Sequence, residues 1–457
     1  MQDNEYLVNR RYYKNTIDLI NKSVIIPKDL CFVLVQHAFS PSIDFYHCIE
    51  PKIASVILKG SSAEQNPSVV AELKRRYGSR ILDTVKRSDL EDSSFTIELL
   101  KKVTRGRPFV ILEYGAYFAP SISAICCDSD LGAKLLGVVE GTDNGIKGSA
   151  DGRTIGYSAV AGHTACPIIS KSRSNIKNIM DIEIGPAIVE ATDKILCNNL
   201  GRKLKHWRGT TAVVGVGSIG NGVLSALNNI GLSPLAHDTD LAVMAKLAHC
   251  RNRVVDQHTI LAESDILFLS TGNCFLSQQP ELLTLFKNNA LLVLCTSGDV
   301  EAGIPQLINR GELQLVKKQS DREIAVYRTR HGKQLRVLFG IDEIGQAPNM
   351  SVEDGSASPA NVMSDMEFYA LGCYLASEHG LSGGKIHESP WHLQKMILKE
   401  WLAEFYPSTI EAPHTSKPLE HFEQRYNNTP ISATDFIDHN FTGKKIVELP
   451  ESHLTKL

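Results

Sequence analysis

A short glycine-rich stretch constrains this chain of 457 residues more than any other feature. In TTAVVGVGSIGNG, Gly215, Gly217 and Gly220 have the spacing G-x-G-x-x-G and follow a run of β-branched residues. Each glycine has its own physical task. The first permits a tight turn, the second lets a pyrophosphate approach the backbone, and the third lets a helix pack closely against the strand. The pattern therefore predicts a strand, a turn and a helix that begins near Ser218.

An acidic residue after the next strand indicates which cofactor such a turn would hold. The predicted strand SPLAHD ends at Asp238, where a carboxylate can accept hydrogen bonds from the ribose hydroxyls. No arginine follows it to receive a 2′-phosphate, so the pattern favours NAD over NADP. A helix N-terminus also offers free N–H groups to phosphates. The cofactor contacts expected in this unit are Gly215, Gly217, Ser218, Ile219, Gly220 and Asp238.

The surrounding chain alternates short apolar runs with helical patterns. From residue 209 to about 345 strands and helices follow each other regularly, which is typical of a doubly wound parallel sheet. The same rhythm begins near residue 28 in LCFVLVQH and ASVILKG. We therefore expect an α/β protein with a Rossmann NAD-binding domain, 190–348, inserted into a second α/β substrate domain, 1–185 plus 352–406, and a tail, 407–457.

Composition argues against several classes of partner. Forty-eight Lys plus Arg against 51 Asp plus Glu give a net charge of -3, so nucleic acid is not expected. The first residues lack the apolar core of a secretory signal, and no run approaches the ~20 apolar residues of a membrane span. A cytoplasmic protein with no membrane partner and reduced cysteines is expected, with no C-x-x-C pair for a metal. Cys126 and Cys127 should point to opposite faces of a strand.

Eight segments, in the right order, resemble the adenosylhomocysteinase family, NAD-dependent enzymes that split S-adenosylhomocysteine into adenosine and homocysteine. They are ILEYGAY, VVEGTDNG, VVGVGSIGNG, AHDTD, STGN, CTSGDVEAG, GQAPNM and SPANVMS. The resemblance runs from about residue 30 to the tail. It implies that Thr142 touches the NAD, that Thr271, followed by Gly272, lies near the pyrophosphate, and that Asn349 holds the nicotinamide amide. The family is commonly a tetramer, so a homo-oligomer is expected.

The same resemblance implies that the family's own reaction is lost. That reaction oxidises a ribose hydroxyl and removes a neighbouring proton, so it needs acids and bases close to the sugar. The family's second Asp, second Glu and two histidines in these segments correspond here to Tyr114, Gly141, Ser297 and Ser356. A general acid or base contributes typically ~10² to 10⁴ in rate. Hydrolysis of S-adenosylhomocysteine is therefore not expected.

Three functions stay open. The first is an NAD-dependent enzyme acting by redox chemistry on a nucleoside-like or other hydroxylated small molecule. The second is a catalytically inactive NAD-binding regulator or scaffold. The third, a 2-hydroxyacid dehydrogenase, is least favoured, because CTSGDVEAG lacks the arginine that would clamp a substrate carboxylate.

An enzyme of the first kind needs polar residues around its substrate. The candidates lie near predicted strand ends or in the segment that corresponds to the family's sugar site, and they are His37, Glu113, Glu140, Lys177 and Asp181. The register of the segment from Ser174 to Asp181 against the family is not fixed. The alternatives are a solvated strand end for Glu113 and Glu140 and a satisfied structural histidine for His37.

Overall fold

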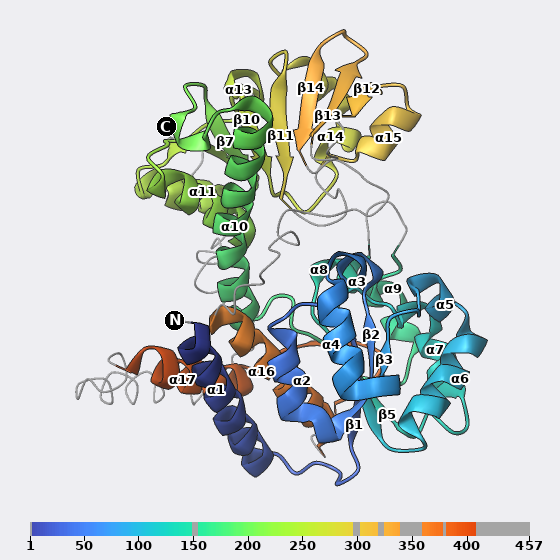
Figure 1. Ribbon diagram of the computed structural model, residues 1–457. Helices are drawn as coiled ribbons and strands as arrows, with labels where there is room; N and C mark the ends of the chain where they lie inside the picture. Colours follow the sequence, from blue (N-terminus) through green and yellow to red (C-terminus); the bar gives the residue numbers. More distant parts are fainter. Residues whose placement is uncertain are drawn as a thin grey trace, which may run out of the picture. The chain divides into compact units, whose positions relative to one another are not determined.

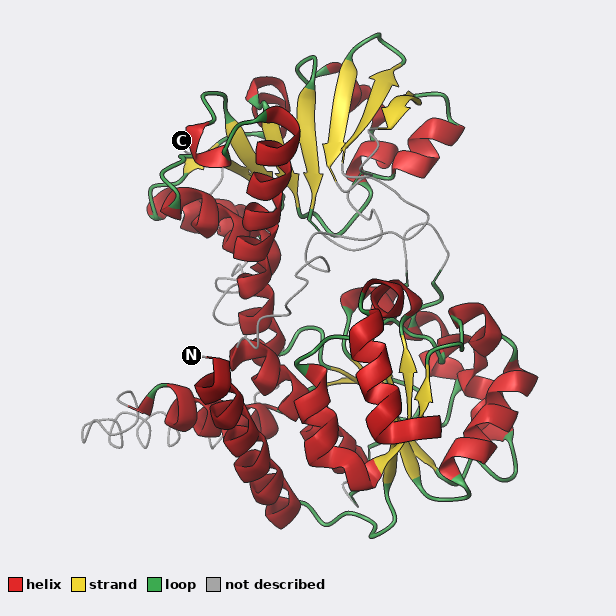
Figure 2. Ribbon diagram, in the orientation of Figure 1, coloured by secondary structure: helices red, strands yellow, loops and turns green. Residues whose placement is uncertain are grey.

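The computed structural model confirms an α/β protein with two sheets (Figures 1 and 2). It describes residues 2–148, 154–295, 302–318, 324–338, 359–377 and 381–407. The chain divides into two compact units, 1–400 and 401–457, and every strand belongs to the first. Within the described residues, no helix is both long and apolar enough to cross a membrane.

The first sheet has seven parallel strands in the order β15-β6-β5-β4-β1-β2-β3. Strands β1 and β2 are buried at every position, because helices cover both faces of a parallel sheet and leave no polar side. The strands are β1 Cys31–Gln36, β2 Ile53–Leu58, β3 Ile81–Leu82, β4 Phe109–Glu113, β5 Leu135–Glu140, β6 Ile168–Ser170 and β15 Ile386–Glu388.

The α-helices that accompany this sheet come from both ends of the described chain. They are α1 Gln2–Ser23, α2 Ser42–Ile49, α3 Gly60–Gln65, α4 Pro67–Tyr77, α5 Arg87–Glu91, α6 Ser93–Thr104, α7 Ile122–Cys127, α8 Asp143–Lys147, α9 Tyr157–Val160, α16 Pro359–Ala376 and α17 Trp391–Phe405. Cys126 and Cys127 therefore end a helix, and the prediction of a strand was wrong. Six residues are too few for sequence periodicity to distinguish the two.

The second sheet has the order β12-β13-β14-β11-β10-β7-β8-β9 and is parallel from β9 to β14. Its strands lie between β6 and β15 in sequence, which confirms the insertion. They are β7 Thr211–Val214, β8 Leu235–His237, β9 Arg253–Val254, β10 Ile266–Leu269, β11 Ala290–Leu294, β12 Leu313–Lys318, β13 Ile324–Thr329 and β14 Gln334–Leu338. The helices are α10 Asn175–Leu200, α11 Ser218–Asn229, α12 Leu241–His249, α13 Gln257–Glu263, α14 Phe275–Gln278 and α15 Ile304–Asn309.

Helices α10 and α11 cross with their backbones in contact. A Cβ added at Gly185 of α10 would overlap the backbone of Gly222 in α11, and a Cβ at Gly222 would overlap the carbonyl oxygen of Ile182. Pro186 has no N–H to donate to that carbonyl, so Gly222 approaches a helical oxygen that Pro186 leaves unpaired. The crossing fixes the start of α11 against the first half of α10.

Candidate functional site

The predicted glycine turn lies between β7 and α11, and its three glycines meet different surroundings. Gly215 has a φ of 83°, and an added Cβ would lie 2.5 Å from the carbonyl oxygen of Ser270. A Cβ at Gly220 would overlap the carbonyl oxygen of Gly215. At Gly217, in contrast, an added Cβ meets no described atom within 4 Å. Two glycines are thus required by the protein's own packing, and the middle one faces open space.

Helix α11 begins at Ser218, as the pattern predicted, and within the described part of the chain no side-chain cap is found at its start. Asp238 follows β8 and lies beside the same turn. Its Oδ2 accepts the N–H of Val216 at 2.6 Å, and its Oδ1 accepts the N–H of Asp240 at 2.9 Å. The turn therefore combines unpaired helix N–H groups with a fixed, half-buried carboxylate.

The remaining predicted cofactor residues are less uniform in position. Thr271 and Gly272 follow β10, and the Cα of Thr271 lies 2.9 Å from the place of an added Cβ at Gly215. Ile219 packs against the core of the second sheet. Thr142 lies after β5 of the first sheet, where its hydroxyl accepts the N–H of Gly145 and caps α8. Asn349 lies outside the described residues.

Glu140 is fully buried at the carboxyl end of β5. Its two oxygens accept the N–H groups of Gly115 at 2.9 Å, Ala116 at 2.8 Å and Thr142 at 2.7 Å, and also the hydroxyl of Thr142. Burial raises the pKa of this carboxyl. Glu140 therefore anchors the loops that follow β4 and β5.

Glu113 ends the neighbouring strand β4, directly across the register from Glu140, and is equally buried. It accepts the N–H of Tyr117 at 2.7 Å, the N–H of Phe118 at 3.3 Å and the hydroxyl of Tyr157. Burial, together with the charge of Glu140, raises its pKa to about 8. The interpretation of these carboxylates as solvated strand ends was wrong, because both hold loops from inside the protein.

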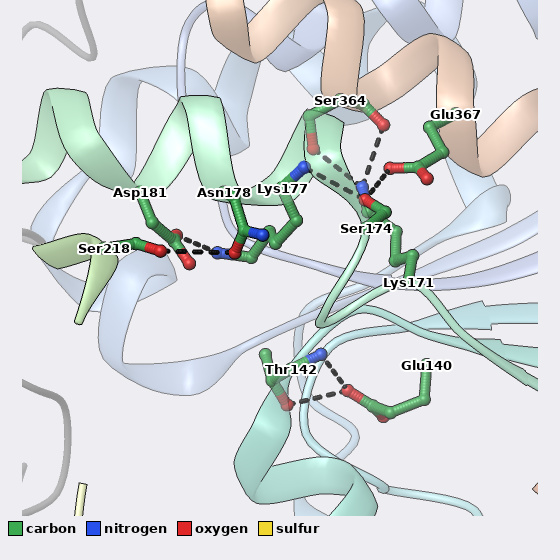
Figure 3. A network of polar contacts seen from close by, with 10 residues as sticks. All are labelled: Glu140, Thr142, Lys171, Ser174, Lys177, Asn178, Asp181, Ser218, Ser364 and Glu367. Carbon is green, nitrogen blue, oxygen red and sulfur yellow. Dashed lines mark hydrogen bonds and ion pairs between the residues drawn. The ribbon is translucent and has the colours of Figure 1, made fainter. Parts of the chain in front are cut away.

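Lys177 and Asp181 lie one turn apart near the start of α10 and form an ion pair with each other (Figure 3). The side chains are 12% and 16% exposed, so the pair is neither fully buried nor freely solvated. Between them, Asn178 accepts a hydrogen bond at 3.2 Å through its Oδ1 from the hydroxyl of Ser218. Lys177 and Asp181 thus lie on the part of α10 that contacts the first residue of α11.

His37 follows β1 and is half-buried, with its ring stacked on Phe39 at 5.3 Å. Its buried Nδ1 has no hydrogen-bond partner among the described residues. Burial, reinforced by the charge of Lys59, lowers its pKa well below 6.5, so the imidazole is neutral at pH 7. The interpretation as a satisfied structural histidine does not fit an unpartnered Nδ1.

Sequence reasoning missed Lys171, which follows β6 and is fully buried. Its Nζ donates to the carbonyl oxygen and hydroxyl of Ser364 (Figure 3) and lies 4.0 Å from the centre of the ring of Phe368. Burial lowers its pKa to about 8. Lys59, half-buried after β2, was missed in the same way. The sequence feature that could have identified both lysines is their position, because each is the first residue after a strand of the parallel sheet.

Comparison with known proteins gives little beyond distant structural likeness. No family model matches the chain, and no curated protein matches it. It is similar to a phosphoglycerate oxidoreductase from Vibrio cholerae O395, with 14% identity, 61% of this chain and 79% of that chain covered, and a TM-score of 0.35. It is also similar to a D-lactate dehydrogenase from Escherichia coli, with 13% identity, 61% of this chain and 79% of that chain covered, and a TM-score of 0.33. A transhydrogenase from Sinorhizobium meliloti is similar with 12% identity, 79% of this chain and 98% of that chain covered, and a TM-score of 0.38. The functional argument therefore rests on this chain's own residues.

Proposed function

We propose that this protein binds NAD at the glycine turn and uses it in redox chemistry on a hydroxylated small molecule, within a frame like that of adenosylhomocysteinase. The observation that carries the proposal is the open space at Gly217. A pyrophosphate needs such a gap beside the free N–H groups of a helix. Gly217 is exposed, so the backbone of this turn is accessible to a pyrophosphate.

Asp238 supports NAD over NADP. Its carboxylate is held beside the turn by the N–H of Val216, in the place from which it can accept hydrogen bonds from the ribose. A 2′-phosphate would meet this negative charge at close range, which is unfavourable. Thr271 lies against the turn, so it can contact the phosphates as proposed, and Asn349 remains the expected contact for the nicotinamide.

NAD, when bound, supplies the hydride acceptor for oxidation of a hydroxyl-bearing carbon. The chain must then bind the substrate and take up the hydroxyl proton. His37 offers a neutral imidazole with an unpartnered Nδ1 for a hydrogen bond to a hydroxyl. Lys177 and Asp181 are the charged pair on the part of α10 that contacts α11. Glu113 and Glu140 act as positioning residues for the loop 114–118.

The cofactor proposal can be tested with Gly217→Val and a matched control. A Cβ added at Gly217 meets no described atom within 4 Å, so the variant should fold and should lose NAD because the side chain fills the pyrophosphate's space. Gly162→Val is the control, since Gly162 is also exposed with open space around it. Mass spectrometry of small molecules released from each purified protein gives the readout. If Gly217→Val retains NAD as well as Gly162→Val does, the cofactor is not bound at this turn.

An NAD-binding regulator without catalysis is the second candidate. It is favoured by one observation, that loop N–H and hydroxyl groups engage the oxygens of both Glu113 and Glu140. Incubation of the protein with NAD and a panel of nucleosides, followed by the absorbance of reduced nicotinamide, separates the two. Reduction of the nicotinamide supports the enzyme, whereas tightly bound NAD that no substrate reduces supports the regulator.

A further inference from the structure

Two cationic side chains converge on one point at the carboxyl edge of the first sheet. Lys59 directly follows β2, and Arg87 is the first residue of α5. A Cβ built on Gly115, in the loop after β4, would lie 3.1 Å from Nη2 of Arg87 and 3.7 Å from Nζ of Lys59. Three segments far apart in sequence thus bring a guanidinium and an ammonium to the same small volume.

The guanidinium of Arg87 is held in a fixed orientation. Its Nη2 donates to the carbonyl oxygen of Gly115 at 2.6 Å, and the group lies over the ring of Tyr117 at 4.1 Å. Tyr117 is fixed in turn, because its N–H donates to Glu113. A stacked guanidinium has little rotational freedom to lose when it binds an oxyanion. Arg87 is therefore prepared for a ligand.

Neither cation forms an ion pair with an acid among the described residues, although the charges of Glu140 and Glu113 partly offset the lowering of the Lys59 pKa. The contact found for the Lys59 ammonium is the ring of Tyr117 at 5.9 Å. Burial, reinforced by the charge of Arg87, lowers the pKa of Lys59 to about 8. The nearby carboxylates of Glu113 and Glu140 are engaged by loop N–H groups, and the raised pKa of Glu113 keeps it protonated at neutral pH. The cluster is left with excess positive charge.

We propose that Lys59 and Arg87 bind an anionic group of the substrate, a carboxylate or a phosphate. An anion would give both cations an anionic partner, through charge-assisted hydrogen bonds that offset the cost of their partial burial. His37 follows β1, the strand that pairs with β2, and the charge of Lys59 contributes to its lowered pKa. The carboxyl edge of a parallel sheet is also where α/β proteins bind their ligands.

This inference rests on the proposed function and narrows its substrate. A neutral nucleoside would leave both cations without an anionic partner. A phosphorylated nucleoside or sugar, or a hydroxylated carboxylic acid, would pair them and still present a hydroxyl for oxidation. The substrate is therefore a small molecule that carries both a hydroxyl and an acidic group.

The test is anion binding to the full chain, measured calorimetrically with inorganic phosphate and with malonate as separate probes. Lys59→Gln removes an ammonium that donates no hydrogen bond among the described residues, so the fold should persist. Affinity for the preferred anion should fall about tenfold or more, as expected for loss of a charged hydrogen bond. Lys86→Gln is the matched control, because Lys86 is an exposed lysine next to Arg87, and it should bind like the wild type.

The choice of probe identifies the acidic group. Stronger binding of phosphate supports a phosphorylated substrate, and stronger binding of malonate supports a carboxylate. No binding of either anion by the wild type, or equal binding by Lys59→Gln and Lys86→Gln, overturns the inference. NAD retention is measured on the same samples. If the wild type retains NAD but binds neither anion, only this inference fails. If it binds an anion but retains no NAD, only the cofactor proposal fails.

Discussion

The two sheets share one topology and differ at the edge where ligands bind. Counted from β3 in the first and β9 in the second, six neighbouring strands of each follow the doubly wound order 3-2-1-4-5-6. In the first sheet the carboxyl edge carries charged side chains, of which Glu113, Glu140 and Lys171 are buried and Lys59 is half-buried. In the second, the described residues at this edge include the glycine turn with Asp238 beside it, and Asp240 and Asp256, which cap helices.

The difference shows two ways to build a site on the same scaffold. At the second sheet, the proposed cofactor binding depends on the space that the backbone leaves open, so an added side chain should block it. At the first, it depends on side chains that separate strands bring together and that loops hold in place. Substitutions at the edge of the first sheet should therefore lower the stability of the protein. Substitutions at the edge of the second sheet should lower the amount of bound NAD.

Glu140→Ala should have the largest effect. The N–H groups of Gly115, Ala116 and Thr142 would lose their buried acceptor, and each unsatisfied group costs about 1–3 kcal/mol. The free energy of unfolding should fall by about 3 kcal/mol or more in chemical denaturation. Glu140→Gln keeps an acceptor oxygen and should lose less. A loss below about 1 kcal/mol in Glu140→Ala would mean that the loops do not depend on this carboxylate.

Gly220→Ala should have the next largest effect and should act on both readouts. Its Cβ would overlap the carbonyl oxygen of Gly215, so the turn must shift, at a cost of about 1–3 kcal/mol, and NAD binding should be lost. Gly137→Ala in β5 is the comparison in the first sheet. Its Cβ first meets the flexible side chain of Leu375 at 2.7 Å, so stability should fall less and NAD should be retained. Retention of NAD by Gly220→Ala would remove the distinction between the two edges.

Glu113→Gln should change how stability depends on pH. The native protein keeps the Glu113 proton up to about pH 8, whereas the unfolded chain releases it near ~4.3. Because the native state binds more protons in this window, Glu113 makes stability fall as the pH rises from about 5 to 8, by at most about 1.4 kcal/mol per pH unit. Denaturation across this range should show a flatter profile in Glu113→Gln. Glu72→Gln, on the exposed face of α4, should keep the wild-type dependence of stability on pH. If both variants show the same dependence, Glu113 is not the group that holds the extra proton in the native state.

Asp238→Asn should have the smallest effect on the fold. An asparagine oxygen can still accept the N–H of Val216, so stability should change by less than about 1 kcal/mol. NAD affinity should fall about tenfold with the loss of the ribose acceptor, and discrimination against NADP should weaken. Titration with both dinucleotides measures this, with Asp256→Asn, at the start of α13, as the control. Unchanged selectivity would show that Asp238 serves only the turn.

The glycine turn could be predicted because its requirements are local. The φ of Gly215 and the tight packing at Gly220 follow from the turn itself, and the spacing of the three glycines expresses them directly. The start of α11 at Ser218 and the parallel, doubly wound character of the sheet followed from the same alternation of strand and helix. These features involve neighbours in sequence or repeat with a regular period.

The charged edge of the first sheet could not be predicted in the same way. The convergence of Lys59 and Arg87 on Gly115 depends on β1 lying between β2 and β4, which no local pattern states. Glu113 and Glu140 were found by their place at strand ends, but their burial depends on loops that fold back over them. Strands β12 and β13 are antiparallel and partly exposed, so they lack the apolar run that marked the other strands.

The contact between Gly185 and Gly222 has a consequence for the history of this sequence. A substitution at one glycine cannot be rescued by a smaller residue at the other, because each already has no side chain and the clash is with backbone. No substitution at one position can compensate for a substitution at the other, so both glycines should change during evolution far more slowly than the residues around them. In descendants too distant for ordinary similarity to be recognised, a glycine followed by proline in the helix before the dinucleotide turn, matched by a glycine just after it, would be a durable mark of common ancestry.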